Sequence, residues 1–352
     1  MSTNKRPFLS IKSLMQDAMM VRQLRFGVGV SASAAIAYAI NWPLAFLFPI
    51  FTTLLLSMPL GQMTPKQLLM ALFNTVKGFC FGLLFSVVLI KFPVIFLLLM
   101  FVSLFYIYYY LNRGGSFWLT LMLMLSILIL PMLNTMSEGL AIGFSLGFVG
   151  SAWAAIVFVF VMYYVVPDTE KVNFPPAKPF SHTYSPIAAQ FALKSTLVAF
   201  PIVAFCITYA RADLLLTMIF AAMFTLKPEL SAGKEAGRNS LISTVLGGAI
   251  AFVFYWALVA VPLFQFFIIL MFGIALYMGM NIFSSNPTGK YYGSAMTCVI
   301  VLINGNMGAD SDFISALVSR ILFISLAILY IVVTLRILDA FIFNKKSPTK
   351  TH

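Results

Sequence analysis

Charged side chains are scarce in this chain of 352 residues and make up only 9% of it. A soluble globular domain carries about a quarter, so the low charge and the hydrophobic share of 61% predict an integral membrane protein. Acidic residues number 10 against 22 basic ones, which gives a formal net charge of +12. Because lysine and arginine collect at the cytoplasmic ends of membrane helices, this charge does not indicate a nucleic-acid partner.

Cysteine and histidine are also rare, with three and two residues. The cysteines lie in apolar segments without the spacing of a disulfide framework or a metal site, and both histidines lie outside those segments. A Walker-type phosphate loop is missing, because position 228, six residues before Lys234, is proline where the motif needs glycine. We therefore expect no metal, no cofactor and no enzymatic activity.

What the chain does contain is one pattern that occurs twice. Each residue of the second copy has a number that is higher by the same amount, as from Arg25 to Lys194, and we call this difference the repeat offset. Five identities and one conserved charge define it: Arg25 and Lys194, Pro59 and Pro228, Gly78 and Gly247, Pro93 and Pro262, Tyr108 and Tyr277, Asn112 and Asn281. Prolines, glycines and asparagines serve backbone geometry or polar contacts, so they weigh more than shared leucines. Duplication of this kind is typical of transporters with a pathway between two halves.

The apolar segments predict an all-α integral membrane protein of about 12 transmembrane helices in two parallel six-helix repeats. The predicted spans are 26–40, 44–60, 68–90, 94–111, 117–133, 140–166, 187–209, 214–226, 241–261, 263–280, 291–303 and 313–338. A cytoplasmic N-terminal segment (1–25) precedes the first repeat (26–166), and a proline-rich linker (167–186) leads to the second (187–340). A basic tail (341–352) follows, and residues 11–21 could form an amphipathic helix on the inner membrane surface.

Basic residues set the predicted orientation. With both termini in the cytoplasm, 19 of the 22 lysines and arginines fall on the inner side, as the positive-inside rule requires. An even number of helices gives both repeats the same orientation, so a cavity between the two repeats follows from the symmetry.

Lys77 and Asn74 are three residues apart and share one face of the third predicted helix. A lysine at that depth is costly unless it faces protein or water. It either attracts anions in a transport pathway or extends to the inner interface, and the two interpretations have similar weight. Leu246 takes its place in the second half.

The end of the fourth predicted helix is rich in tyrosine, at Tyr106, Tyr108, Tyr109 and Tyr110. Such a run near the inner interface is typical of an aromatic belt, and stacking of aromatic substrates is the alternative. Small residues at Gly78 and Gly82 in the preceding helix favour close helix packing.

Arg320 lies inside the last apolar segment, and arginine cannot lose its charge there. Pairing with Asp310 or Asp312 and lining of a substrate pathway both remain open. Asn304 and Asn306 close the fifth predicted helix of the second repeat.

The fifth helices of both repeats are predicted to be short or broken, one of them by Pro131. Paired interruptions at matching positions can mark a binding site. Asparagines that cap a turn are the alternative.

A polar turn follows the second predicted helix of each half. It reads Met58-Pro59-Leu60-Gly61 before Lys66 and Lys77-Gly78 in the first half, and Lys227-Pro228-Glu229-Leu230-Ser231-Ala232-Gly233-Lys234 through Arg238 to Gly247 in the second. This pattern resembles the fusaric acid resistance protein-like (FUSC) superfamily, which includes bacterial aromatic acid exporters and is similar to the plant aluminium-activated malate transporters. The resemblance covers nearly the entire chain. One difference is that larger exporters of the superfamily carry a soluble cytoplasmic domain, which this sequence does not show. It implies proton coupling and a periplasmic adaptor protein.

The predicted function is efflux of organic, aromatic acid anions across the bacterial cell inner membrane. Lys77, Lys234 and Arg238 would guide the substrate from the cytoplasm, and Arg320 would act nearer the outer exit. Glu229, with Glu235 nearby, is the candidate for proton coupling. The expected partners are membrane lipid, a small organic anion and the adaptor. A passive organic-anion channel and a non-transporting scaffold of an envelope complex are the alternatives.

Overall fold

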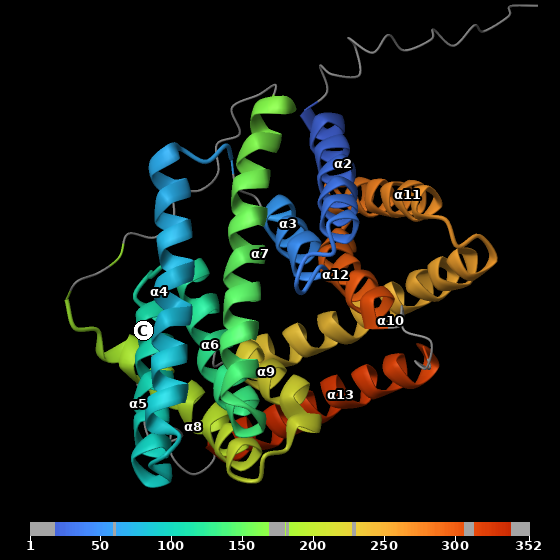
Figure 1. Ribbon diagram of the computed structural model, residues 1–352. Coiled ribbons are helices and arrows are strands. Elements are labelled where there is room, and N and C mark those ends of the chain that lie inside the picture. The colour runs from blue at the N-terminus through green and yellow to red at the C-terminus, as the bar shows by residue number, and fades with distance from the viewer. Residues whose placement is uncertain are drawn as a thin grey trace, which may run out of the picture. The chain divides into compact units, whose positions relative to one another are not determined.

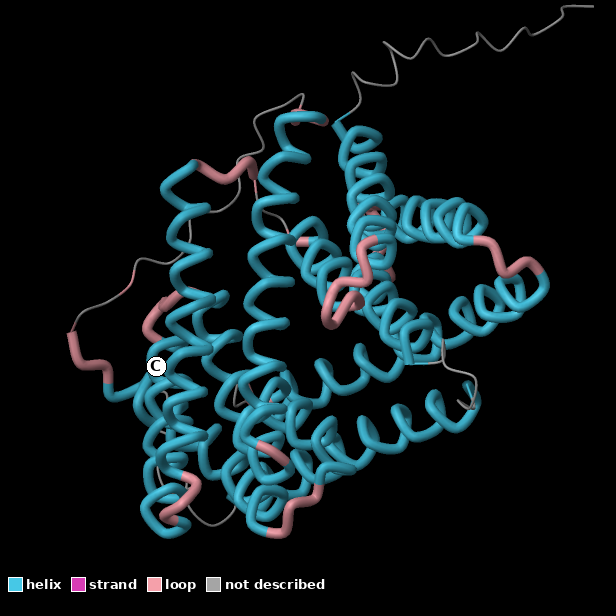
Figure 2. Tube along the Cα trace, viewed as in Figure 1, coloured by secondary structure: helices cyan, strands magenta, loops and turns pink. Residues whose placement is uncertain are grey.

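The computed structural model describes residues 18–58, 61–168, 180, 183–226, 230–305 and 313–338, without the side chains of 230–234 and 305. The regular secondary structure of these residues is all helical, with twelve α-helices, one short 3-10 helix and no strand (Figure 1, Figure 2). Most of the predicted surface helix at 11–21, the tail at 341–352 and most of the linker lie outside the described residues.

Each of the twelve predicted spans overlaps one α-helix. The first half of the chain contains α2 (Ala18–Ala39), α3 (Leu47–Ser57), α4 (Pro65–Leu89), α5 (Pro93–Asn112), α6 (Phe117–Met136) and α7 (Glu138–Val165). The second half contains α8 (Pro186–Thr208), η1 (Ala212–Leu214), α9 (Leu215–Phe224), α10 (Leu230–Ala260), α11 (Phe264–Ile282), α12 (Gly289–Gly305) and α13 (Phe313–Leu338). Pro93 and Pro186 stand at the first turn of their helices, where proline removes no helical hydrogen bond.

Eight of the described helices are long and apolar enough to cross a bilayer, namely α4, α5, α6, α7, α8, α10, α11 and α13. They make the chain a multi-pass membrane protein in contact with lipid. Large apolar side chains such as Leu84 and Val253 are accordingly exposed, by 66% and 69%. The other four predicted spans, α2, α3, α9 and α12, fall short in length or in hydropathy.

The short apolar helices are α3 and α9, with 11 and 10 residues. At 1.5 Å per residue each covers about 16 Å, roughly half of the hydrocarbon core. Adding the repeat offset to the bounds of α3 gives 216–226, which overlaps α9. The two short helices therefore lie at matching positions of the two halves. The predicted break at Pro131 is wrong, because this proline lies inside α6, which runs over 20 residues from Phe117 to Met136. The paired short helices are the second of each half, not the fifth.

The repeat offset recurs in the local geometry. Asn41 and Ala210 both have a positive φ, of 48° and 47°, directly after α2 and α8. Asn112 and Asn281 each donate a hydrogen bond from the side-chain amide to the carbonyl oxygen four residues earlier, at 2.8 Å in both cases. The matching positions therefore share backbone conformation as well as residue type.

The helices are grouped in two compact units. Unit 1 comprises Met1–Leu69, Ser151–Pro175 and Leu246–Ser311, and unit 2 comprises Met70–Gly150, Pro176–Val245 and Asp312–His352. Each unit combines helices from both halves of the chain. In unit 1, α11 packs against α2 and α12 against α3, whereas in unit 2 α5 packs against α8 and α6 against α9. The repeat offset relates α2 to α8, α11 to α5, α3 to α9 and α12 to α6. Each unit therefore contains the same two helix pairs, with the contributions of the two halves exchanged. The repeat boundaries at 166 and 187 stay a prediction.

Glycines allow close helix contacts within each unit. In unit 2, a β-carbon on Gly78 would lie 2.8 Å from Cβ of Met122 in α6. In unit 1, a β-carbon on Gly247 would lie 2.5 Å from the carbonyl oxygen of Ala295 in α12. Gly82 faces Ser126 in the same way, so the predicted packing role of Gly78 and Gly82 is confirmed.

Candidate functional site

Lys77 lines a groove of about 540 Å³ in unit 2, between α4, α5 and α6. Eight further residues form its walls: Phe81 from α4, Val102, Ser103, Tyr106, Ile107 and Tyr110 from α5, and Leu119 and Leu123 from α6. The volume lies in the range of small-molecule sites. The lining is apolar and aromatic except for the lysine ammonium group and the serine and tyrosine hydroxyl groups.

Lys77 is the middle residue of α4, which runs from Pro65 to Leu89. At 1.5 Å per residue it lies about 18 Å along the axis from either end. This is farther than a side chain of four methylene groups can extend, but the Lys77 side chain is exposed on α4, so the pathway and interface interpretations both stay open. An ammonium group at this depth needs a protein, water or anion partner.

The α4–α6 wall of the groove is held by polar contacts as well as by small residues. Nε1 of Trp118 donates to Oγ1 of Thr75 at 2.9 Å, near the start of α6. One turn farther along α4, Oγ of Ser126 donates to the carbonyl oxygen of Gly78 at 2.8 Å. These contacts fix the register of the two helices on both sides of Lys77.

Tyr110 lines the groove and is fixed by the turn between α5 and α6. The backbone N–H of Ser116 donates to its hydroxyl oxygen at 3.1 Å. Gly115 lies directly against the tyrosine ring, where a β-carbon would collide with it. Because the oxygen accepts this bond, its own proton stays available to a ligand. The guanidinium group of Arg113 lies nearby, over the rings of Tyr109 and Phe180 at 5.1 and 5.0 Å.

The arrangement suits an amphipathic anion. An aromatic ring can lie against the apolar walls, where its burial is favourable. Its carboxylate can accept hydrogen bonds from the Lys77 ammonium group and the Tyr110 hydroxyl group, and bonds to a charged group are the stronger ones. Tyr106 is 62% exposed and adds an aromatic face for stacking.

The other residues predicted for the inner part of the pathway are not among those that line this groove. Asn74 is buried in α4 and is not among the lining residues. Arg238 and Glu235 are exposed on α10. Lys234 is also on α10, but its side chain lies outside the described residues, as does all of Glu229.

The residues predicted for the outer part of the pathway are only partly described. Asn304 accepts a hydrogen bond at Oδ1 from the hydroxyl of Tyr38, at 3.0 Å, within unit 1. Asn306 lies outside the described residues. Arg320 is half-buried on α13, and within the described chain its Nε atom is buried without a hydrogen-bond partner. Pairing with Asp310 or Asp312 stays untested, because both precede the described start of α13.

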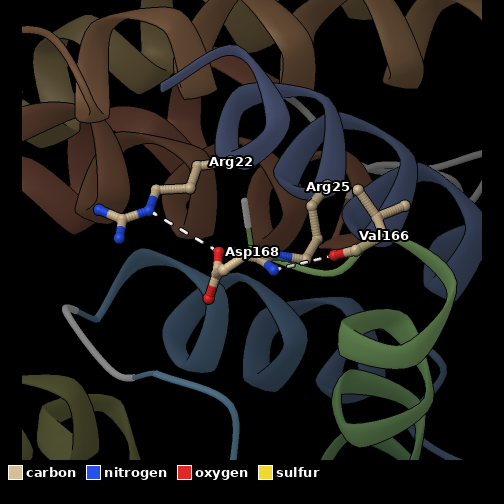
Figure 3. A network of polar contacts seen from close by, with 4 residues as sticks. All are labelled: Arg22, Arg25, Val166 and Asp168. Atoms are coloured by element: carbon tan, nitrogen blue, oxygen red, sulfur yellow. Dashed lines mark hydrogen bonds and ion pairs between the residues drawn. The ribbon is translucent and has the colours of Figure 1, made fainter. Parts of the chain in front are cut away.

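A buried ion pair in unit 1 was not predicted (Figure 3). Arg25 on α2 is 4% exposed and donates to Oδ1 of Asp168 at 2.6 Å and to the carbonyl oxygen of Val166 at 3.0 Å. Its guanidinium group also lies 3.8 Å above the ring of Tyr163. Arg22 approaches the same carboxylate at 3.9 Å. The network ties the start of α2 to the end of α7. The nearest signal in the sequence is an aspartate directly after Pro167.

Comparison with known proteins gives a match to a family model over part of the chain. Residues 22–162 match a family of membrane proteins described as "Protein of unknown function (DUF2955)". The matched range runs from α2 almost to the end of α7, and it covers less than half of the chain. No curated protein and no solved structure matches. The chain is therefore similar to this membrane-protein family across the helices that form the groove.

Proposed function

We propose that the protein exports organic, aromatic acid anions across a bacterial inner membrane and that the Lys77 groove binds the substrate. The observation that carries the proposal is an ammonium group at the middle of a membrane helix, in a groove with aromatic walls. Charged groups at this depth are costly and are found mostly at substrate or ion pathways. A substrate that supplies one negative charge and one apolar ring complements this groove.

The wider architecture in this proposal is two parallel six-helix repeats with both termini in the cytoplasm, as in FUSC proteins. Three observations support it: the shared φ at Asn41 and Ala210, the shared side-chain bonds of Asn112 and Asn281, and the paired short helices α3 and α9. Short helices at matching positions of two halves are a recognised feature of transporters. The basic cytoplasmic surface would concentrate anions at the inner mouth.

Binding of benzoate to the purified protein in detergent tests the groove directly. Lys77→Met removes the charge but keeps most of the side-chain volume, and we expect it to weaken binding about 10-fold or more, because a hydrogen bond to a charged group contributes about 1.5–3 kcal/mol. Lys77→Arg should retain part of the affinity. Lys91→Met, an exposed lysine outside the groove, is the matched control. Equal benzoate affinity of wild type and Lys77→Met would rule out the groove as the substrate site.

Export itself is tested in cells. A deletion strain should be more sensitive than its parent to a panel of weak aromatic acids, and wild type but not Lys77→Met should restore tolerance. Membrane levels of the variant are measured alongside. A deletion strain with normal tolerance across the panel would count against export and favour the envelope scaffold, in which case a partner complex should dissolve in that strain.

The passive channel differs from the exporter in its energy source. Current through a planar bilayer without a proton gradient would favour the channel, whereas accumulation of benzoate that collapses with the proton gradient would favour proton-coupled export. Glu235→Gln should abolish the coupled component if this residue carries the proton. A periplasmic adaptor that co-purifies with the protein would extend the route through the envelope.

A further inference from the structure

A second pocket lies in unit 1, beside α3 and the start of α12. Its volume is about 320 Å³. Its lining is more polar than that of the Lys77 groove and includes Ser57 from α3 and Gly289, Lys290, Gly293, Ser294 and Thr297 from α12. None of these residues belongs to the site described above.

The matching positions in unit 2 show that this helix pair does not require polar residues. The repeat offset relates the α3–α12 pair to the α9–α6 pair, and both pairs are in contact. Ser57 corresponds to Leu226, and Lys290, Gly293, Ser294 and Thr297 correspond to Leu121, Met124, Leu125 and Leu128. Met124 and Leu128 are completely buried in the hydrophobic core of unit 2, and Leu226 packs against that core. One copy of the helix pair is therefore closed by apolar side chains, and the other is open and polar.

The register of this comparison rests on geometry as well as on sequence. The positive φ of Asn41 and Ala210 and the side-chain bonds of Asn112 and Asn281 keep the same spacing. The two copies thus provide an internal control. Packing alone accounts for leucine and methionine at these positions, and it gives no reason for a lysine and three hydroxyl groups.

The glycines keep the pocket open. A β-carbon on Gly293 would meet Cβ of Ser57 at 3.5 Å, which is ordinary contact, so any longer side chain here would enter the pocket. A β-carbon on Gly289 would lie 2.7 Å from the carbonyl oxygen of Asn281 at the end of α11. Glycine at 289 therefore lets α12 begin close to α11.

The polar groups of the pocket are suited to an anion. Ser57 and Thr297 now donate their hydroxyl protons to carbonyl oxygens of their own helices, at 3.0 and 2.7 Å. Hydroxyl groups rotate, so the same protons can be redirected to a ligand oxygen. The Lys290 ammonium group, which lies 5.5 Å from the ring centroid of Tyr291, adds a positive charge and N–H donors. Acidic side chains are absent from the described residues that line the pocket.

We propose that this pocket binds a small hydrophilic oxyanion through a carboxylate or phosphate group. The Lys290 ammonium group and the hydroxyl groups of Ser57, Ser294 and Thr297 are its ligands. The pocket is smaller and more polar than the Lys77 groove, so it selects compact anions and not aromatic ones. This site is independent of the function proposed above.

Inorganic phosphate and malonate, titrated into the purified protein in detergent, test the site. We expect saturable binding of at least one of them, weakened at least 10-fold in Lys290→Leu and in Lys290→Gln. The double variant Gly293→Met with Ser294→Leu copies the matching positions of unit 2, so it should fold and lose binding. Lys66→Leu, an exposed lysine in the first turn of α4, should bind as wild type does. Binding unaffected by both Lys290 variants, or no saturable binding, would overturn the proposal.

Two membrane compositions identify the source of the anion. In nanodiscs of phosphatidylcholine alone, wild type should bind phosphate as in detergent. If the ligand is a lipid headgroup, phosphatidylglycerol in the nanodisc should compete with phosphate and lower the apparent phosphate affinity of the wild type. If the ligand is a free ion, phosphate affinity should be equal in the two membranes. Benzoate binding through Lys77 should not change in any of the pocket variants. The proposal for the pocket and the proposal for the Lys77 groove can therefore be refuted separately.

Discussion

Asn41 and Ala210 share a left-handed backbone conformation although they belong to different halves of the chain, with φ of 48° and 47°. Each follows the first helix of its half and ends it. Glycine adopts this conformation freely, asparagine adopts it fairly often, and alanine is strained in it. The fold thus demands the same geometry twice, and only the first copy has a residue suited to it.

Ala210→Gly should therefore stabilise the protein. Relief of the strained φ outweighs the larger entropy of glycine in the unfolded chain, and we expect a gain of roughly 0.5–1 kcal/mol in the free energy of unfolding. Ala204→Gly, inside the preceding helix α8, is the control and should lower that free energy by a similar amount. Denaturation with a graded detergent measures both. If both variants raised, or both lowered, the free energy of unfolding, strain at Ala210 would not account for the result.

The glycine contacts give a second prediction. Gly247→Ala should destabilise unit 1 by roughly 1–3 kcal/mol, because the new methyl group meets the backbone carbonyl oxygen of Ala295, which cannot rotate away. Gly78→Ala should act similarly against Met122. Gly143→Ala is the matched control, since its β-carbon has open space within 4 Å. In detergent, the unfolding temperature of Gly143→Ala should equal or exceed that of wild type, and those of Gly247→Ala and Gly78→Ala should lie below that of wild type.

The buried ion pair is the subject of a third prediction. Asp168→Asn leaves Arg25 buried next to a neutral amide, and we expect a loss of roughly 1.5–3 kcal/mol in the free energy of unfolding. Arg22→Gln should cost less, because its contact is long at 3.9 Å and more exposed. Asp213→Asn, which breaks the exposed pair with Arg211, should leave unfolding unchanged. Equal effects of Asp168→Asn and Asp213→Asn would show that burial of Arg25 is not what matters.

Two tyrosines two residues apart should respond differently to loss of the hydroxyl group. Tyr108 is completely buried and donates to the carbonyl oxygen of Ala222 at 2.9 Å, next to Oγ1 of Thr225. Tyr108→Phe should therefore lower the free energy of unfolding by roughly 0.5–1.5 kcal/mol and leave benzoate binding unchanged. Tyr110→Phe should weaken benzoate binding about 2- to 10-fold, and it should lower the free energy of unfolding less than Tyr108→Phe does, because its hydroxyl group is only partly buried and accepts one hydrogen bond. Calorimetric titration and thermal unfolding on both variants check the pair. If Tyr110→Phe left benzoate binding unchanged and Tyr108→Phe weakened it, Tyr110 would not belong to the substrate site.

Much of the fold was predictable from local pattern. Apolar segments of helical length indicated the twelve α-helices of the described residues. The repeat register was readable because proline, glycine and asparagine answer to backbone geometry, which both copies share. The break expected at Pro131 was wrong, since a proline in a membrane helix can be accommodated when neighbouring groups satisfy the freed carbonyl.

The partners of each helix were not predictable. An apolar face toward lipid and one toward protein look alike in sequence, so nothing in α2 indicates that it packs against α11. Lys77 stood out because a charge inside a membrane helix is rare. The role of Tyr110 depends on a turn that directs the N–H of Ser116 to its hydroxyl oxygen, and the Arg25–Asp168 pair joins residues 143 positions apart. Such contacts follow only from the tertiary structure.

The exchange of helices between the two halves has a consequence for biosynthesis. The ring of Phe26 on α2 packs edge-on against Phe283, just after α11, with centroids 6.1 Å apart. A ribosome adding about 5–20 residues per second needs on the order of ten seconds or more to make the chain between them. During that time α2 has been synthesised, but α11, against which it packs, has not. The nascent first half must therefore be shielded by lipid or by insertion factors until the second half arrives.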